Sequence, residues 1–210
     1  MFLSGLCTLN FTAAKSLLSV TAIDCWGFFA PFVANIMCCP QLEATVTVLI
    51  GQSSKHTNAL ALNGTVAKHC LSDVEQILMG QGASGDLRQI CSISSSNLTE
   101  ASCPVKHVND FNDMVDTSKL LLACADIDPV KECCYQVCHN AILEAATAIA
   151  SKGSHVLDVD ASHDLPAHSI RVNDCRNIVL RWIASKLDLS HGKKVLRGLS
   201  NCNMNKGLFE

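Results

Sequence analysis

The order of the cysteines is the feature that most constrains the fold of this chain. Thirteen of its 210 residues are cysteine, and two pairs are adjacent, Cys38-Cys39 and Cys133-Cys134. No two cysteines have the C-x2-C spacing typical of zinc sites, so we assign no metal ligands. The cysteines therefore predict a disulfide framework, which persists in oxidising compartments such as the extracellular space.

Twelve cysteines fall into two sets of six in which the adjacent pair holds the same rank. We predict an internal duplication, with repeat 1 at 7–91, a Ser-rich linker at 92–102 and repeat 2 at 103–202. The connectivity within each set stays open. The cysteines expected to form disulfides are Cys7, Cys25, Cys38, Cys39, Cys70, Cys91, Cys103, Cys124, Cys133, Cys134, Cys175 and Cys202.

The adjacent cysteines and the thirteenth cysteine allow two further predictions. Neighbouring side chains on a helix point about 100° apart, so the two members of each doublet should bond to different partners. Cys138 has no counterpart in the first set, where Glu43 stands at the matching position. We therefore predict that Cys138 is unpaired.

The spacing of apolar residues is helical. Val172, Cys175, Val179 and Trp182 follow three- and four-residue steps. Asp128 before Pro129 is typical of a helix start. Residues 42–50 are ambiguous, because their β-branched residues favour a strand and their neighbours favour a helix. The predicted fold class is all-α, stapled by disulfides.

Charge and motifs argue against several classes of function. The net charge is −3, and no concentrated basic face suggests nucleic-acid binding. We interpret the densest basic cluster, Lys193, Lys194 and Arg197, as a solvated helix face. Cys138 and His139 are adjacent and would point apart on a helix, which does not suit a nucleophile and its base. We interpret the acidic and His-rich segment of His155, His163 and His168 as a polar surface loop. We predict a non-enzymatic protein with no catalytic residues and no cofactor.

Glycosylation sequons and apolar segments bear on the compartment. Asn10, Asn63 and Asn97 each begin an Asn-x-Ser/Thr sequon and are predicted N-glycosylation sites. The apolar stretch 26–37 is too short to span a membrane, and Pro31 interrupts it. No secretory signal or hydrophobic tail is visible. Because a disulfide framework requires export, we expect this chain to be a fragment or a truncated product.

Several longer segments resemble one family. They are CPVK at 103–106, VDTSKLLLAC at 115–124, DPVKECC at 128–134, QVCHNAILEAA at 136–146, RVNDCRNIVLRW at 171–182, LRGLSNC at 196–202, LCTLNF at 6–11 and CCPQLEA at 38–44. Over 4–205 the chain resembles the uncharacterised plant GPI-anchored proteins with a SPARK domain, which is named for the ectodomain of arbuscular receptor-like kinases. The resemblance implies a secreted precursor, lipid-anchored outside the plasma membrane, and brings no catalytic residues.

Two functions remain open. The first is a cell-surface module that binds an extracellular protein, peptide or glycan, or that serves a receptor kinase as co-receptor. Its contact with the membrane would be only through the GPI anchor of the full-length form. The alternative is a small apolar ligand carrier resembling a lipid-transfer protein. A continuous apolar cavity would favour the carrier, and an exposed aromatic patch would favour the interaction module.

Overall fold

The computed structural model describes residues 3–152 and 165–205, and within these ranges the fold is all-α. Isolated bridges, Trp26 with Ala83 and Ala59 with His107, are the only β pairing in the described residues. Residues 42–50 are helical. The helices are α1 (Lys15–Asp24), α2 (Ala30–Val33), the π-helix η1 (Ala34–Cys38), α3 (Cys39–Thr57), α4 (Gly64–Met79), α5 (Leu87–Ile90), the 3-10 helix η2 (Ser95–Leu98), α6 (Val108–Met114), α7 (Thr117–Cys124), α8 (Pro129–Tyr135), α9 (Val137–Lys152), α10 (Leu165–Lys186) and α11 (Leu189–Asn205).

Local sequence accounts for several helix starts. The Asp128 carboxylate accepts from the backbone N–H groups of Val130 and Lys131, and Pro129 is the first residue of α8, as predicted. Asn63 caps α4 and Asp116 caps α7 in the same manner. These caps satisfy backbone donors that a helix cannot pair internally.

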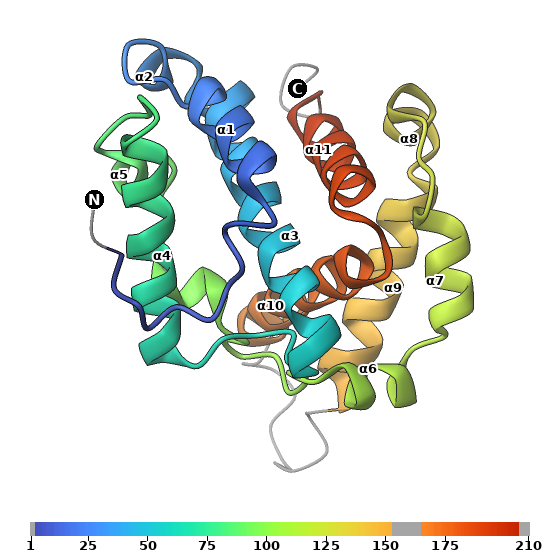
Figure 1. The fold of residues 1–210 in the computed structure, drawn as a ribbon. Helices are drawn as coiled ribbons and strands as arrows, with labels where there is room; N and C mark the ends of the chain where they lie inside the picture. Colours follow the sequence, from blue (N-terminus) through green and yellow to red (C-terminus); the bar gives the residue numbers. More distant parts are fainter. Residues whose placement is uncertain (1–2, 153–164, 206–210) are drawn as a thin grey trace.

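Helix α3 lies at the centre of the molecule, and α10 and α11 pack against it (Figure 1). Gly51 of α3 permits the close approach of α10. A Cβ atom at Gly51 would lie 2.5 Å from the carbonyl oxygen of Arg181 and 2.7 Å from the Cβ of Ala184. At the same level, the rings of Phe111 and Trp182 stack with centroids 5.0 Å apart, and both side chains are buried.

The two predicted repeats pack against each other around one hydrophobic core. Helices α1, α2, α4 and α5 lie on one side and α7 to α9 on the other, with α3, α10 and α11 between them (Figure 1). The segment 92–102 is Ser-rich but well packed, because Ile93 and Leu98 are buried. The buried guanidinium of Arg181 donates to the carbonyl oxygens of Asn97 and Thr99, which holds this segment against α10. The duplication itself stays a prediction.

Six disulfides staple the helices. They are Cys7–Cys70, Cys25–Cys38, Cys39–Cys91, Cys103–Cys175, Cys124–Cys138 and Cys133–Cys202. As predicted, Cys38 and Cys39 bond to different partners. In the second doublet only Cys133 is bonded, so the prediction of two partners is wrong there.

The prediction that Cys138 is unpaired is also wrong. Cys138 is buried and bonded to Cys124, and the free cysteine of the described residues is the exposed Cys134. The reason is a break in the helix. Gln136 has a left-handed backbone conformation with φ of 54°, which ends α8 and begins α9 at Val137. A new helix direction turns Cys138 toward α7, whereas a continuous helix would have kept it on the face near Cys134.

Candidate functional site

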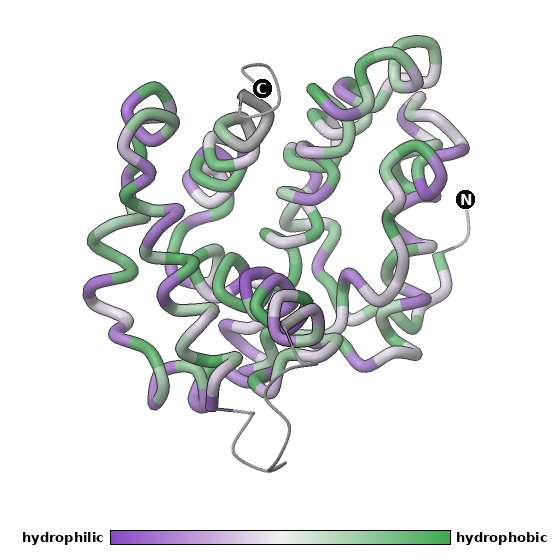
Figure 2. Tube along the Cα trace, turned by 180° about the vertical axis from the view of Figure 1, so that it is seen from behind, coloured by the Kyte–Doolittle hydropathy of each residue, from purple (hydrophilic) through white to green (hydrophobic). Residues whose placement is uncertain are grey.

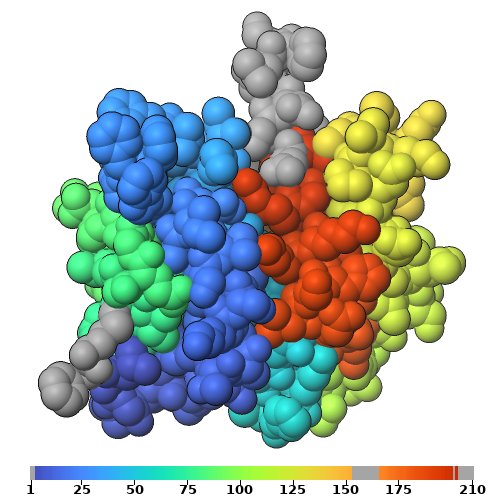
Figure 3. Space-filling model, turned by 45° about the horizontal axis from the view of Figure 1, so that its top comes forward, coloured from blue at the N-terminus to red at the C-terminus, as the bar shows by residue number. Residues whose placement is uncertain are grey.

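One surface of the molecule is strongly apolar. We call residues 26–37 the aromatic lobe. In this segment Phe32 is 81% exposed, and the other exposed large apolar side chains are Trp26, Phe28, Phe29, Ile36 and Met37. The lobe forms the hydrophobic outer end of the fold in Figure 2 and one corner of the surface in Figure 3. No charged residue occurs from Cys25 to Leu42.

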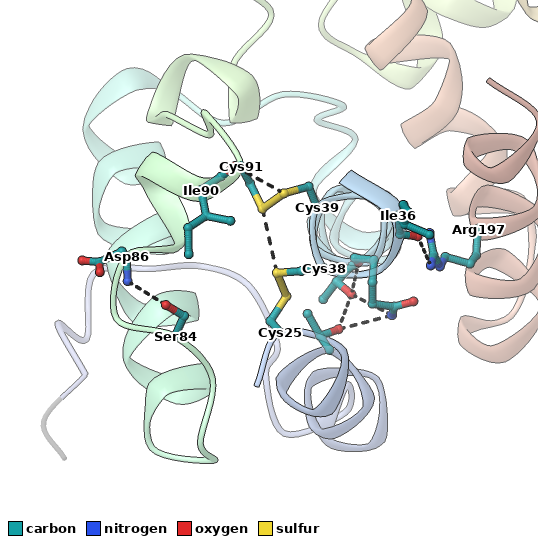
Figure 4. Close-up of a disulfide and its surroundings, with 12 residues drawn as sticks. Cys25, Ile36, Cys38, Cys39, Ser84, Asp86, Ile90, Cys91 and Arg197 are labelled. Carbon is teal, nitrogen blue, oxygen red and sulfur yellow. Dashed lines mark hydrogen bonds between the residues drawn. A yellow bond between two sulfur atoms is a disulfide. The ribbon is translucent and has the colours of Figure 1, made fainter. Parts of the chain in front are cut away.

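The lobe is held in place by covalent and backbone bonds. The disulfide Cys25–Cys38 closes it into a ring, and the neighbouring disulfide Cys39–Cys91 ties its end to the segment after α5 (Figure 4). The backbone N–H of Gly27 donates to the carbonyl of Gly82. The aromatic rings also support one another, with centroids of Phe28 and Phe29 5.1 Å apart. The exposed rings therefore stand on a preorganised base.

Arg197 of α11 borders the lobe. Its guanidinium donates to the backbone carbonyl of Ile36 at 3.0 Å (Figure 4). Burial lowers the pKa of Arg197, and nearby Asp24 opposes that effect. The prediction of a purely solvated basic face is wrong for this residue, because a neighbour far away in sequence accepts its hydrogen bond.

The run Ala30–Thr57 is long and apolar enough to cross a membrane by length and composition alone. However, 61% of its most apolar window is buried inside the protein, as in the core helix of a globular fold. Most of that window belongs to α3 at the centre of the core. Its apolar character is explained by packing in the core.

The sulfur atoms of Cys38, Cys39 and Cys91 lie within 4.8 Å of one another. The Sγ atoms of Cys38 and Cys91 are 3.8 Å apart, although they belong to different disulfides. Metal binding by cysteine requires thiolates, and all three sulfurs are engaged in disulfides. This cluster therefore consists of two adjacent disulfides and is not a metal site.

A recess of about 260 Å³ lies where α3, α10, α11 and the 92–102 segment meet. We call it the junction cleft. Residues from both predicted repeats line it, which places it at the boundary between them. Its polar lining residues include Glu43, Thr47, Asn173, Arg176, Asn177 and Ser200.

Glu43 and Arg176 are opposite charges in the lining of the junction cleft, but they do not form a close ion pair. Among the described residues, Arg176 has no hydrogen bond or ion pair. Burial lowers the pKa of Arg176, and the charge of Glu43 opposes that shift. Burial raises the pKa of Glu43, and Arg176 counters it. Arg176 is half-buried and Glu43 is exposed at the rim, and neither makes a close ion pair with a described residue.

The three predicted glycosylation sites are all exposed. The backbone N–H of Leu62 bonds to the carbonyl of Leu98, so the sequons at Asn63 and Asn97 lie near each other. The lobe lies at the other end of α4, because the backbone N–H of Ser84 bonds to the carbonyl of Cys25. Figure 1 shows the two ends of α4 well apart.

Sequence reasoning missed the junction cleft and treated the lobe only as a short apolar stretch. Glu43 and Arg176 are far apart in the chain, and no local pattern links them. The absence of charge from Cys25 to Leu42, with four aromatic residues inside a cysteine ring, was a signal for the lobe. His155 and His163 lie outside the described residues, whereas His168 is on α10, so the prediction of a loop is wrong for His168.

Together, these features define a disulfide-stapled helical domain of an oxidising compartment. The SPARK family matches residues 3–176, and the chain belongs to this family. It is 59% identical over 204 residues to an uncharacterized GPI-anchored protein of Arabidopsis thaliana, covering 97% of this chain and 45% of that relative. The chain therefore spans less than half the length of that relative. No solved structure matches it.

Proposed function

We propose that this chain is a non-enzymatic recognition domain of a GPI-anchored protein, located outside the cell, and that it binds a protein partner through the aromatic lobe. The Arabidopsis relative is named as GPI-anchored, which supports a cell-surface location. The six disulfides are consistent with an oxidising compartment. The ectodomain of a receptor kinase is one candidate partner that the family resemblance implies.

The exposure of the aromatic lobe carries this proposal. Isolated apolar residues are common on protein surfaces, but a contiguous patch with Trp26, Phe28 and Phe32 marks an interaction site. Tryptophan and other aromatic residues are enriched in the buried centres of protein interfaces. Because the disulfide ring already fixes the backbone, binding costs less conformational entropy than ordering a flexible loop.

Charges of both signs around the base of the lobe favour a protein partner over a lipid surface. Asp24 and Asp86 lie near it, as does Arg197. An apolar centre inside a polar rim of mixed sign is typical of protein–protein interfaces. A surface that binds anionic lipids would carry mainly basic side chains at this level.

The non-enzymatic part of the proposal rests on the chemistry of the titratable groups. Among the described residues, the free thiol of Cys134 is exposed and has no hydrogen-bonded base. The closest carboxylate–histidine pair, Glu132 with His139, is used structurally, because the same carboxylate accepts from the backbone N–H groups of Cys138 and His139. Neither group is arranged as an activated nucleophile.

The alternative function, a carrier of a small apolar ligand, is not supported by the pockets found among the described residues. Four of these pockets have volumes of about 90 to 320 Å³, and each has charged or polar side chains in its lining. A lipid carrier requires a continuous apolar interior cavity. We therefore retain only the interaction module.

The experiment measures binding of the fluorescently labelled full chain, secreted with its disulfides, to plant protoplasts. The double variant Phe28→Ser/Phe32→Ser tests the lobe. Leu122→Ser is the matched control, because Leu122 of α7 is 89% exposed but lies outside the lobe. We expect saturable binding by the wild type and the control, and at least a tenfold loss for the lobe variant with an unchanged circular dichroism spectrum.

Two further arms identify the partner class. Protease treatment of the protoplasts should abolish binding, and vesicles of phosphatidylcholine and phosphatidylserine should not bind the chain. Equal binding by the lobe variant would overturn the proposal. Binding to vesicles that depends on Phe28 and Phe32 would replace the protein partner with a membrane.

A further inference from the structure

We infer that the junction cleft is a binding site for a small polar ligand that carries a single carboxylate, and that Arg176 is the residue that binds this carboxylate. The site is separate from the aromatic lobe. This inference is independent of the proposed protein partner, because it assigns a small-molecule ligand to a different part of the same domain.

The first observation is the unused donor capacity of Arg176. A guanidinium has five N–H donors, and Arg176 is half-buried in the wall of the cleft. Arg176 faces the cleft and has no hydrogen bond or ion pair with any described residue. Arg181 of the same helix differs sharply, because its guanidinium donates to three backbone carbonyls, those of Leu60, Asn97 and Thr99. Arg181 is thus structural, whereas Arg176 is available to a ligand.

The second observation is the charge of the cleft. Glu43 from α3 and two arginines of α10, Arg176 and Arg181, line it together, so the lining carries a net charge of about +1. A cleft with one excess positive charge, in which only the Arg176 guanidinium makes no hydrogen bond to a described residue, suits a monovalent anion better than a dianionic phosphate or sulfate. Arginine binds a carboxylate through two parallel N–H to oxygen bonds, which gives both strength and orientation.

The remaining lining suits a polar ligand body. The amides of Asn173 and Asn177 and the hydroxyl of Ser200 can donate to and accept from ligand hydroxyl or peptide groups. Leu196 and Leu199 supply an apolar wall. The volume of about 260 Å³ is close to the lower end of the range for small-molecule pockets, about 300 Å³.

The cleft is built on rigid elements. Three helices form its walls, and Arg181 fixes the 92–102 segment that closes it. The Cys39–Cys91 disulfide adds a covalent tie between α3 and the start of that segment. A site on packed helices holds its donors in position before the ligand arrives, which reduces the entropic cost of binding.

A carboxylate of this size has two common sources outside cells, an acidic sugar and the C-terminus of a peptide. The experiment therefore titrates the full chain with four probes and follows binding by calorimetry and by the side-chain Nε–H resonances of arginine. The probes are D-galacturonate, neutral D-galactose, N-acetyl-Ala-Ala and the C-terminal amide of that peptide. The chain is produced without N-glycans in the bacterial periplasm, because Asn97 lines the cleft.

We expect one carboxylate probe to bind and its neutral analogue to bind at least tenfold more weakly. Arg176→Gln should weaken carboxylate binding at least tenfold, and Glu43→Gln should strengthen it several-fold by removing a facing negative charge. Lys194→Gln, a substitution of an exposed residue on α11, should leave carboxylate binding unchanged. The lobe variant Phe28→Ser/Phe32→Ser should also bind the carboxylate with wild-type affinity, whether or not the lobe binds a partner. Galacturonate binding identifies an acidic sugar, and peptide binding identifies a C-terminus. Unchanged affinity in Arg176→Gln, or no binding of either carboxylate at millimolar concentration, would overturn the inference.

Discussion

Cys138 is joined to Cys124 by a disulfide that ties the first turn of α9 to the end of α7. The same turn is capped by the carboxylate of Glu132, which accepts from the backbone N–H groups of Cys138 and His139 at 3.1 and 2.8 Å. One covalent bond and one cap therefore fix the break between α8 and α9. This arrangement leaves Cys134 unbonded on the exposed side of α8.

The state of Cys134 gives the first prediction. Alkylation of the native, non-reduced chain should label Cys134 and leave Cys138 protected, because only an accessible thiolate reacts. Peptide mass spectrometry after digestion locates the label. Cys134→Ser should abolish labelling and any disulfide-linked dimer, and should change the free energy of unfolding by less than about 0.5 kcal/mol. Label on Cys138 in the wild type would show that the Cys124 pairing is wrong.

The cap formed by Glu132 predicts a pH dependence of stability. Burial alone would raise the pKa of this carboxyl, but hydrogen bonds from His139 and Cys138 outweigh it, and the pKa lies below its usual 4.5. The stabilisation is therefore complete above about pH 4.5 and is lost as the pH falls through the lower folded-state pKa. Glu132→Gln should reduce the loss of stability in acid, measured by urea unfolding at a series of pH values.

The contribution of the Glu132 cap to the free energy of unfolding is measured separately at pH 7. Glu132→Ala should lower the free energy of unfolding by about 1–2 kcal/mol, the range found when helix caps are removed. Asp113→Ala serves as the control for loss of an acidic side chain elsewhere, on α6. If Glu132→Gln and the wild type lose stability in parallel as the pH falls, the cap is not the titrating group.

The contact between α3 and α10 gives a prediction at Gly51. Gly51→Ala would place a methyl group against the Arg181 carbonyl and force the helices apart, at a cost of about 1–3 kcal/mol. Gly64→Ala is the matched control, because nothing lies within 4 Å of a Cβ atom there and Gly64 is the first residue of α4. It should stabilise the protein by up to about 1 kcal/mol. Urea unfolding compares the two variants, and equal stabilities would contradict the close approach.

The exposed sequons give a prediction for a chain secreted from eukaryotic cells. Enzymatic removal of N-glycans should reduce the mass, and Asn10→Gln, Asn63→Gln and Asn97→Gln should each remove one glycan. The side-chain oxygens of the three asparagines accept local backbone N–H groups, which leaves their amide nitrogens free for attachment. Intact mass spectrometry counts the glycans. A wild-type mass equal to that of the bare chain would refute all three sites.

The pairing order of the disulfides relates to the predicted duplication. In each half the first cysteine bonds to the fifth, as in Cys7–Cys70 and Cys103–Cys175. In each half a short bridge also starts at the second cysteine, over 13 residues in Cys25–Cys38 and 14 in Cys124–Cys138. However, the adjacent cysteines pair differently in the two halves: the third cysteine bonds to the second in Cys25–Cys38 but to the sixth in Cys133–Cys202, so the duplication stays a prediction. Superposition of residues 7–91 on 103–202 remains its test.

Local chemistry in the sequence determined much of the fold. Helical periodicity predicted α10, the Asp128-Pro129 pair predicted the start of α8, and the cysteine content predicted the staples. The split between Cys38 and Cys39 also followed from the geometry of adjacent helical residues. The helix starts and the periodicity depend on neighbours within a few residues, so the sequence by itself was sufficient for them, whereas cysteine content predicted disulfides but not which cysteines pair.

Tertiary structure alone decided the remaining features, because each depends on residues distant in sequence. The left-handed conformation of Gln136 redirected Cys138, which no local apolar pattern revealed. The apolar composition of residues 26–37 is equally consistent with a buried and with an exposed segment. The segment is exposed in the structure, where α3 and its neighbours fill the core. Glu43 of α3 and Arg176 of α10 line the same cleft only because α10 packs across α3. Burial of apolar side chains that are distant in sequence drives this packing, so no local pattern predicts it.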